Sequence, residues 1–304
     1  MAELELDQLE LPVSGKPLTI SMKGIDIAAQ EWGNPKGQPV LALHGWLDNS
    51  ASYEWLAPAI AAMSDDYRIV AVDLPGHGLS GHWPEYHHYH LWAGVEDIEH
   101  IVDALGWDRF HLLGHSMGAA ISVLYAGTFP NRLRSLSMIE AIGPMSGSID
   151  EVPDRLADAI LKMKAHQPAQ KFHPNKDQFI EARMSGMIKL KRPASEAIIS
   201  RSLISEENGF AWRNDKRVML PSMMRLPEKV VQSFLKKITA PTLGLYAEDG
   251  MLGQQSAKET MLDPRWACIS SKKELHWMTG GHHLHMEGDV PSISKSLLAF
   301  WQKS

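Results

Sequence analysis

The 304-residue sequence contains a single cysteine, Cys268, which excludes an intramolecular disulfide framework and fits a reducing compartment. No apolar run is long enough to span a bilayer, and the acidic stretch at residues 1–7 lacks the apolar core of a signal peptide. The formal net charge is only −6, which gives no electrostatic reason to expect nucleic acid or an anionic membrane as a partner. We therefore expect a cytoplasmic, soluble protein.

Metal-binding motifs are missing from the sequence, although it has fifteen histidines. It contains no cysteine cluster and no His-Glu-x-x-His sequence, patterns that mark zinc sites. Histidines gather in two stretches, 82–90 and 282–285, and we expect the first to be an exposed loop. We expect neither a metal nor another cofactor.

Short apolar strands alternate with amphipathic helices along most of the chain. The expected strands are residues 18–22, 25–32, 40–43, 68–72, 110–114, 133–139, 242–246 and 268–272. The expected helices are residues 53–63, 92–105, 117–127 and 293–302. This alternation predicts an α/β fold, a mainly parallel sheet with helices on both faces, whose reactive groups gather at the carboxyl ends of the strands.

The alternation breaks between residues 143 and 236, a stretch with a helical pattern that is rich in methionine, charge and proline. We predict that 143–236 is a helical cap inserted into a core made of residues 1–142 and 237–304. The methionines of this stretch suit either a malleable acyl pocket or packing between cap helices; they are Met163, Met184, Met187, Met219, Met223 and Met224.

The most informative stretch is an apolar strand pattern that runs into Gly114-His115-Ser116-Met117-Gly118 and then into a helical pattern. A Gly-x-Ser-x-Gly sequence between a strand and a helix predicts a nucleophile elbow, a sharp turn that exposes the serine hydroxyl. The flanking glycines leave room for this turn, and the start of the following helix directs N–H groups towards the reacting centre. We predict that Ser116 is a nucleophile.

A serine nucleophile needs a base, and the base needs an acid to orient it. In hydrolases with this elbow the order along the chain is serine, acid, histidine. The loop between the last expected strand and the last expected helix contains Gly281-His282-His283-Leu284-His285. We predict His282 as the base, with the adjacent His283 as the alternative.

Two carboxylates are candidates for the acid. Asp249 follows the strand after the predicted cap, and Glu140 follows the strand before it. Either side chain can face the histidine from the end of its strand, so the residues alone leave the choice open.

Attack on a carbonyl group also needs donors aimed at the developing oxyanion. The loop after strand 40–43 reads His44-Gly45-Trp46-Leu47-Asp48-Asn49. We expect the backbone N–H of Trp46 and that of Met117, the residue after the nucleophile, to form the oxyanion hole. We expect His44, Gly45 and His115 to support this loop and the elbow, and the turn at 73–80 to be structural.

Together these motifs resemble the α/β-hydrolase superfamily, and the resemblance covers nearly the whole chain. The loop from His44 to Asn49, the turn Gly76-His77-Gly78-Leu79-Ser80, the elbow and the stretch from Gly281 to Met286 are most similar to the serine hydrolase-like proteins. The resemblance implies a mainly parallel eight-stranded sheet, a helical cap and a serine hydrolase that acts on esters or related acyl compounds.

The resemblance also bears on the acid. The position at which many superfamily members carry it corresponds, counted from Pro241, to Gly250. Some haloalkane dehalogenases carry a glutamate after the earlier strand in a Glu-Ala-Ile context, which Glu140 shares, and so do serine hydrolase-like proteins. The resemblance therefore favours Glu140 over Asp249. The dehalogenases and epoxide hydrolases use an aspartate nucleophile, whereas this chain has Ser116, so neither of those activities is expected.

We expect a cofactor-independent carboxylic-ester hydrolase whose partner is a small ester or acyl substrate. The alternatives are a carbon–carbon bond hydrolase or lyase with the same triad, and a hydrolase-fold protein that binds a ligand without catalysis. The sequence makes no prediction of the oligomeric state or of the natural substrate.

Overall fold

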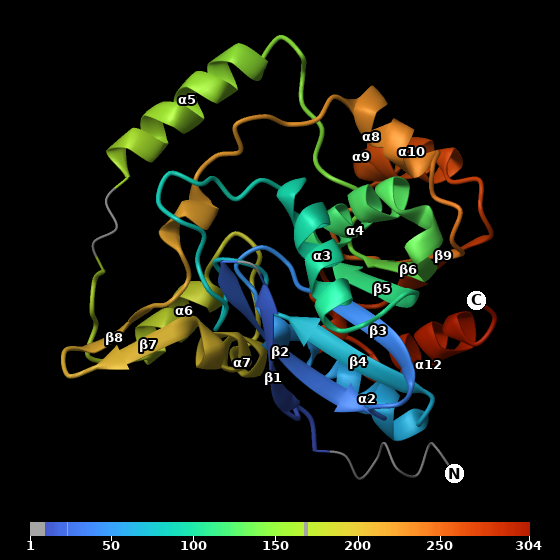
Figure 1. Cartoon of the computed structure of the whole chain (residues 1–304), viewed down its shortest axis with the longest axis horizontal. Helices are drawn as coiled ribbons and strands as arrows, with labels where there is room; N and C mark the ends of the chain where they lie inside the picture. Colours follow the sequence, from blue (N-terminus) through green and yellow to red (C-terminus); the bar gives the residue numbers. More distant parts are fainter. Residues whose placement is uncertain (1–9, 23, 167–169) are drawn as a thin grey trace.

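Eight strands form one sheet across the molecule (Figure 1), in the computed structural model, which describes residues 10–22, 24–166 and 170–304. The strands are β1 (Lys16–Met22), β2 (Ile25–Gly33), β3 (Gln38–Leu43), β4 (Tyr67–Val72), β5 (Phe110–His115), β6 (Leu133–Ile139), β9 (Thr242–Ala247) and β10 (Lys273–Met278). Their order is β1-β2-β4-β3-β5-β6-β9-β10. Only β2 runs against its neighbours, and the pairs from β4 to β10 are parallel. The predicted mainly parallel sheet is confirmed.

One strand prediction is wrong. Residues 268–272 were expected to form the last strand, but α10 ends at Cys268 and the strand β10 begins at Lys273. This strand lies at the edge of the sheet, and all six of its residues are only half-buried. An edge strand needs no continuous apolar run, so β10 lacked the signal on which the prediction relied.

The helices lie on both faces of the sheet, as expected. They are η1 (Ser50–Tyr53), α2 (Leu56–Met63), α3 (Ala93–Ala104), α4 (Met117–Thr128), η2 (Pro130–Arg132), α5 (Val152–Ala165), α6 (Asp177–Met184), α7 (Arg192–Ser202), η3 (Lys216–Met219), α8 (Glu228–Leu235), α9 (Gln255–Ala257), the π-helical η4 (Lys258–Leu262), α10 (Asp263–Cys268), α11 (Leu284–Glu287) and α12 (Val290–Trp301). The helices α3, α4 and α8 pack on one face, and α2 and α12 pack on the other.

The central strands belong to two apolar cores at once. In β3, Leu41 and Leu43 lie in the core beneath α3 and α4, whereas Val40 and Ala42 lie in the core beneath α2 and α12. Successive side chains of a strand point to opposite faces, so a strand covered on both sides is apolar throughout. The loops that carry the site emerge at the carboxyl ends of the central strands β3, β5 and β6.

The segment between β6 and β9 carries α5 to α8 and a hairpin of β7 (Leu203–Glu206) and β8 (Gly209–Trp212). The hairpin was not predicted, although Asn208-Gly209 is a hairpin signal and Gly209 has a φ of +109°. Helix α8 packs into the main core through Val231 and Leu235. Helix α5 lies apart from the sheet (Figure 1), and Ala159 is its one buried residue.

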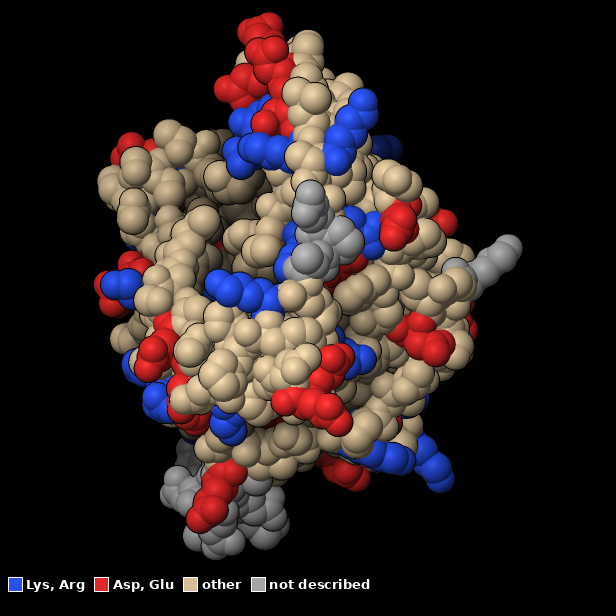
Figure 2. Space-filling view, turned by 90° about the vertical axis from the view of Figure 1, so that its left-hand side faces the viewer, with Lys and Arg blue, Asp and Glu red and all other residues tan. Residues whose placement is uncertain are grey.

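Acidic and basic side chains are interspersed over the face on which this segment lies (Figure 2), with no field of a single sign. Within the described residues, no helix combines the length and the apolar character that crossing a membrane requires.

Candidate active site

Ser116 stands at the sharp turn between β5 and α4, with φ +51° and ψ −113°. A positive φ is strained for a residue with a Cβ and is often found at functional positions. The turn also explains its glycines, because a Cβ at Gly114 would lie 2.6 Å from the backbone of Ala119 and one at Gly118 would lie 2.2 Å from the Leu43 carbonyl oxygen. The predicted elbow geometry is present, and the Ser116 side chain is partly exposed.

His282 lies against Ser116, on the loop between β10 and α11. Its Nε2 is 2.9 Å from Ser116 Oγ, and its Nδ1 is 3.2 Å from Glu140 Oε2. Since a carboxylate only accepts hydrogen bonds, Nδ1 carries the proton and Nε2 is left to accept the serine hydroxyl. The structure thus brings together the three residues that the sequence singled out.

Glu140 directly follows β6 and is 1 % exposed. Its φ of +57° is unusual for a non-glycine residue. Its Oε1 accepts the Ala247 N–H at 2.6 Å, and its Oε2 accepts the Met251 N–H at 3.2 Å. These bonds hold the carboxylate towards His282.

Asp249, the alternative acid, is exposed, and its backbone N–H donates to the Gly280 carbonyl oxygen. No hydrogen bond or ion pair joins its side chain to His282 within the part of the chain that the structure describes. The loop that carries Asp249 has a glycine, Gly250, at the position where many superfamily members have the acid. A Cβ at this position would lie 2.2 Å from Glu140 Oε2. The Glu140 carboxylate occupies the space that a side chain at position 250 would need.

The loop after β3 passes beside Ser116. Leu47 has a φ of +62°, and the Trp46 indole N–H donates to the Val218 carbonyl oxygen at 2.9 Å, which ties the loop to the inserted segment. The Met117 N–H is at the first position of α4 and so has no partner inside that helix. No acceptor for either the Trp46 or the Met117 backbone N–H is found among the described residues.

His44 and Gly45 shape this loop from within. The buried His44 accepts the Leu74 N–H at Nε2, 2.9 Å away, so its Nδ1–H donates to the Gly45 carbonyl oxygen at 2.7 Å. Burial lowers the pKa of His44, which keeps the ring neutral in this arrangement. A Cβ at Gly45 would lie 2.9 Å from both His115 Nδ1 and Asp48 Oδ2, so the close approach requires glycine.

A second buried network lies beneath the base. His115 Nε2 donates to the backbone carbonyl oxygen of His282 at 2.9 Å. His283, the alternative base, makes no hydrogen bond to Ser116 within the described residues. Its Nε2 lies 3.2 Å from Asp48 Oδ2, and Arg183 of α6 binds the other oxygen of Asp48. Burial raises the pKa of Asp48, but His283 and Arg183 outweigh it and hold that pKa well below its usual range.

Asp48 and Arg183 were not assigned a role from the sequence. Asp48 stands inside the His-Gly-Trp-Leu-Asp-Asn loop, so the motif itself was the available signal. Arg183 had no such signal, because its contact with Asp48 joins residues 135 positions apart. The pair fastens the inserted segment to the loop that carries Trp46.

Among the residues that the structure describes, Asp48, His115 and His283 form one group that could hold a metal ion, since one ligand atom from each lies within 4.8 Å of the others. The Arg183 guanidinium already provides the positive charge beside this carboxylate. A divalent ion would have to overcome that repulsion. The absence of a metal cofactor therefore remains a prediction.

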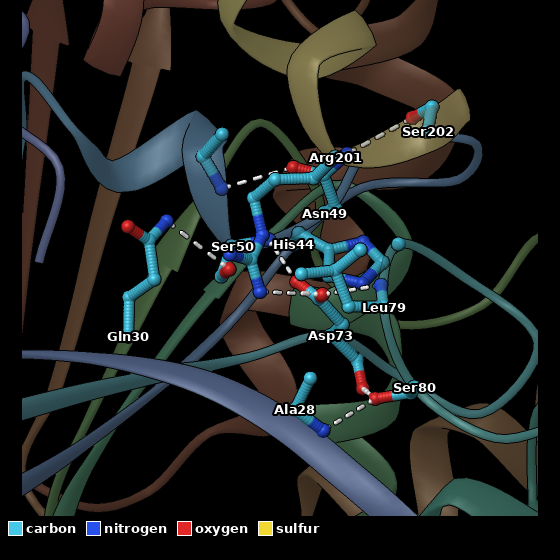
Figure 3. A network of polar contacts seen from close by, with 12 residues as sticks. Ala28, Gln30, His44, Asn49, Ser50, Asp73, Leu79, Ser80, Arg201 and Ser202 are labelled. Carbon is cyan, nitrogen blue, oxygen red and sulfur yellow. Dashed lines mark hydrogen bonds and ion pairs between the residues drawn. The ribbon is translucent and has the colours of Figure 1, made fainter. Parts of the chain in front are cut away.

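The turn after β4 is built around Asp73 (Figure 3). Asp73 accepts the N–H groups of Ser50 and Leu79, both at 2.7 Å, and the guanidinium of Arg201 at 2.8 Å. Arg201 belongs to α7, so this turn is a second point at which the inserted segment is joined to the sheet.

Two cavities meet at Ser116, and Ser116 is the one residue that lines both. One has a volume of about 320 Å³ and includes Trp46, Arg183 and His282 in its wall. The other has a volume of about 300 Å³ and is lined by Met117, Glu140 and several more methionines. Of the methionines singled out earlier, Met187 and Met219 line the first cavity, Met224 lines the second, and Met184 packs in a small apolar cluster.

The class of protein follows from a family model described as the alpha/beta hydrolase fold, which matches residues 38–289. The chain belongs to the α/β-hydrolase family.

Relatives narrow this further and confirm the resemblance to serine hydrolase-like proteins. One such protein from Dictyostelium discoideum is 30% identical over 287 residues, covering 91% of this chain and 79% of that protein. Serine hydrolase-like protein 2 of Homo sapiens is 29% identical over 289 residues and is covered, like this chain, to 90%.

Solved structures agree with the family. The crystal structure of a hypothetical protein from Pseudomonas aeruginosa is 35% identical, with a TM-score of 0.83 over 95% of this chain and 98% of that one. A thioesterase domain from the curacin biosynthetic pathway, 22% identical, has a TM-score of 0.80 over 94% of this chain and 99% of that one. At that identity the likeness is one of fold alone.

Proposed function

We propose that this protein is a carboxylic-ester hydrolase that works through a Ser116–His282–Glu140 triad and an acyl-enzyme. One observation carries the proposal: Ser116 Oγ, the His282 ring and the Glu140 carboxylate form a continuous chain with distances of 2.9 and 3.2 Å. Such a chain gives a serine the base and the oriented tautomer that it needs to act as a nucleophile.

Acylation would begin as the Ser116 hydroxyl proton passes to His282 Nε2 and Oγ attacks the acyl carbon. The carbonyl electron pair moves onto oxygen, where the N–H groups of Trp46 and Met117 hold the oxyanion. When the intermediate collapses, the alkoxide leaves with the proton from His282 Nε2. Water then repeats the sequence: His282 takes its proton, the oxygen attacks the acyl carbon, and Ser116 leaves and regains a proton.

The inserted segment 143–236 is part of the proposal as the cap over the site. It is joined to the core loops at Asp48 through Arg183 and at Asp73 through Arg201. These two ion pairs support a cap in which α6 and α7 are held over the carboxyl ends of β3 and β4. A cytoplasmic location and independence from cofactors complete the proposal and rest on the single cysteine and the absence of a metal motif in the sequence.

The test is the turnover of short p-nitrophenyl esters by the wild type and by Ser116→Ala. We expect kcat to fall by at least about 10⁴-fold, because the whole triad acts through this oxygen. Ser122→Ala is the matched control, since it removes a hydroxyl from the same helix that binds only the Gly118 carbonyl oxygen. Full activity in Ser116→Ala would exclude the mechanism, and turnover of β-diketones but not of esters would favour carbon–carbon hydrolysis.

A further inference from the structure

The two cavities at Ser116 differ in which reactive groups they contain. The base-side chamber, of about 320 Å³, has His282 and Trp46 in its wall together with Arg183, Asn214, Met187 and Met219. The methionine chamber, of about 300 Å³, has Met117, Met145, Met224, Met251 and Met261 in its wall. An ester bound at Ser116 has two substituents on its reacting centre, so each chamber has room for one of them.

The direction of proton transfer decides which chamber takes the alcohol and which takes the acyl group. The leaving oxygen must receive its proton from His282 Nε2, so it must lie within hydrogen-bond reach of that atom. His282 lines the base-side chamber and is not part of the wall of the methionine chamber. The alcohol therefore extends into the base-side chamber, and the acyl group is left with the methionine chamber. The water that completes the reaction meets the same requirement and enters on the side from which the alcohol has left.

Both chambers have an arginine in their walls, Arg183 in the base-side chamber and Arg225 in the methionine chamber. The methionine chamber differs in having five methionines in its wall, against two in the base-side chamber. Methionine side chains are unbranched and polarizable, so five of them form a wall that adapts to a flexible chain. Among the five, Met145 and Met251 are about half exposed, which places the mouth of the chamber at these two side chains.

The methionine chamber has space for more than the smallest acyl groups. Its volume of about 300 Å³ leaves room for several methylene groups. Each methylene group moved out of water adds to binding. The gain continues until the chamber is full and then stops.

We infer that the methionine chamber is the acyl site and that the enzyme prefers flexible acyl chains of several carbons over acetyl groups, with the alcohol in the base-side chamber. This inference rests on the proposed function. Met224 lines the acyl site and Met219 lines the alcohol site, so substitutions at these two residues test the two preferences separately.

The experiment compares Met224→Trp with Met219→Trp, a matched pair because both methionines are at least one-third exposed and each lines a different chamber. kcat/KM is measured on p-nitrophenyl esters from acetate to dodecanoate, and on acetate esters of ethanol, butanol and octanol. We expect the octanoate-to-acetate ratio to fall at least about tenfold in Met224→Trp, since the ring removes space for several methylene groups. The octanol-to-ethanol ratio falls in Met219→Trp.

Met224→Ala provides a second measurement that does not depend on accommodating a larger side chain. It enlarges the methionine chamber, so the preferred acyl chain becomes longer. An unchanged acyl profile in both Met224 variants, or a shortened one in Met219→Trp, overturns the inference while ester turnover leaves the proposed function standing. If the wild type hydrolyses no ester and a fluorophosphonate does not label Ser116, the proposed function and the inference are both overturned.

Discussion

The Glu140 carboxylate orients the proposed base. It accepts two backbone N–H groups and faces His282. Glu140→Gln keeps the shape but removes the charge that stabilises the protonated ring and selects its tautomer. We expect kcat on p-nitrophenyl esters to fall about 10³–10⁴-fold. Asp249→Asn is the control, since Asp249 is exposed. Equal damage in the control would contradict Glu140 as the acid.

The space shared by Glu140 and Gly250 allows a stricter test. Because the three atoms nearest to a Cβ at position 250 would all belong to the Glu140 carboxylate, Gly250→Asp alone should disable the site. We expect Glu140→Ala/Gly250→Asp to recover at least about tenfold in kcat over Glu140→Ala, since the new carboxylate enters the vacated space. Glu140→Ala/Gly250→Asn controls for charge. If kcat of the aspartate variant is no higher than that of the asparagine variant, a carboxylate at position 250 cannot replace the one at position 140.

Individual site residues were predictable where the signal was local. Ser116 lies in a five-residue motif, and His282 follows a glycine pair between the last strand and the last helix. The residues alone left the choice between Glu140 and Asp249 open, because it depends on which strand end faces His282, and only the family resemblance favoured Glu140. Arg183 had no signal of either kind, since an ion pair with Asp48, 135 positions away, leaves no pattern along the chain.

At the scale of elements, α7 is joined to the turn after β4 by Arg201 and the fully buried Asp73. Arg201→Met leaves the buried carboxylate with its N–H donors but without a cation, and we expect the free energy of unfolding to fall by about 2–4 kcal/mol in urea titrations. Adding Asp73→Asn should restore part of the loss. Arg155→Met breaks the exposed pair with Glu151 on α5 and should change stability by less than about 0.5 kcal/mol. If the two arginine substitutions lower the free energy of unfolding equally, the burial of Asp73 does not determine the size of the loss.

Buried elements were predicted better than exposed ones, for a physical reason. Strands such as β3 and β5 are covered on both faces and so read as apolar runs. The edge strand β10 and the hairpin β7–β8 need only alternation and a turn, which are weaker signals. Helix α8 lies within the segment predicted as the cap and packs beside α4. The sequence pattern alone does not say where a helix docks.

The molecule as a whole carries buried histidines whose titration should weaken the fold in mild acid. Burial lowers the pKa of His77, His111 and His285 to about 3, whereas an unfolded histidine has a pKa of about 6.5. Between these values the unfolded chain binds more protons than the folded protein, so the free energy of unfolding falls as the pH drops below about 6.5. The loss is at most about 1.4 kcal/mol per pH unit for each such histidine.

Urea unfolding between pH 7.5 and 5.0 at constant ionic strength measures this slope. We expect the free energy of unfolding to fall with a slope that corresponds to the uptake of at least one proton on unfolding. His111→Gln should reduce the slope, because it removes one titrating ring from a position in β5 where Ser135 Oγ and Gln38 Oε1 are its partners, far along the strand from Ser116. A free energy of unfolding that stays constant or rises below pH 6.5 would mean that these rings are protonated in the folded protein, and that their burial does not keep them neutral.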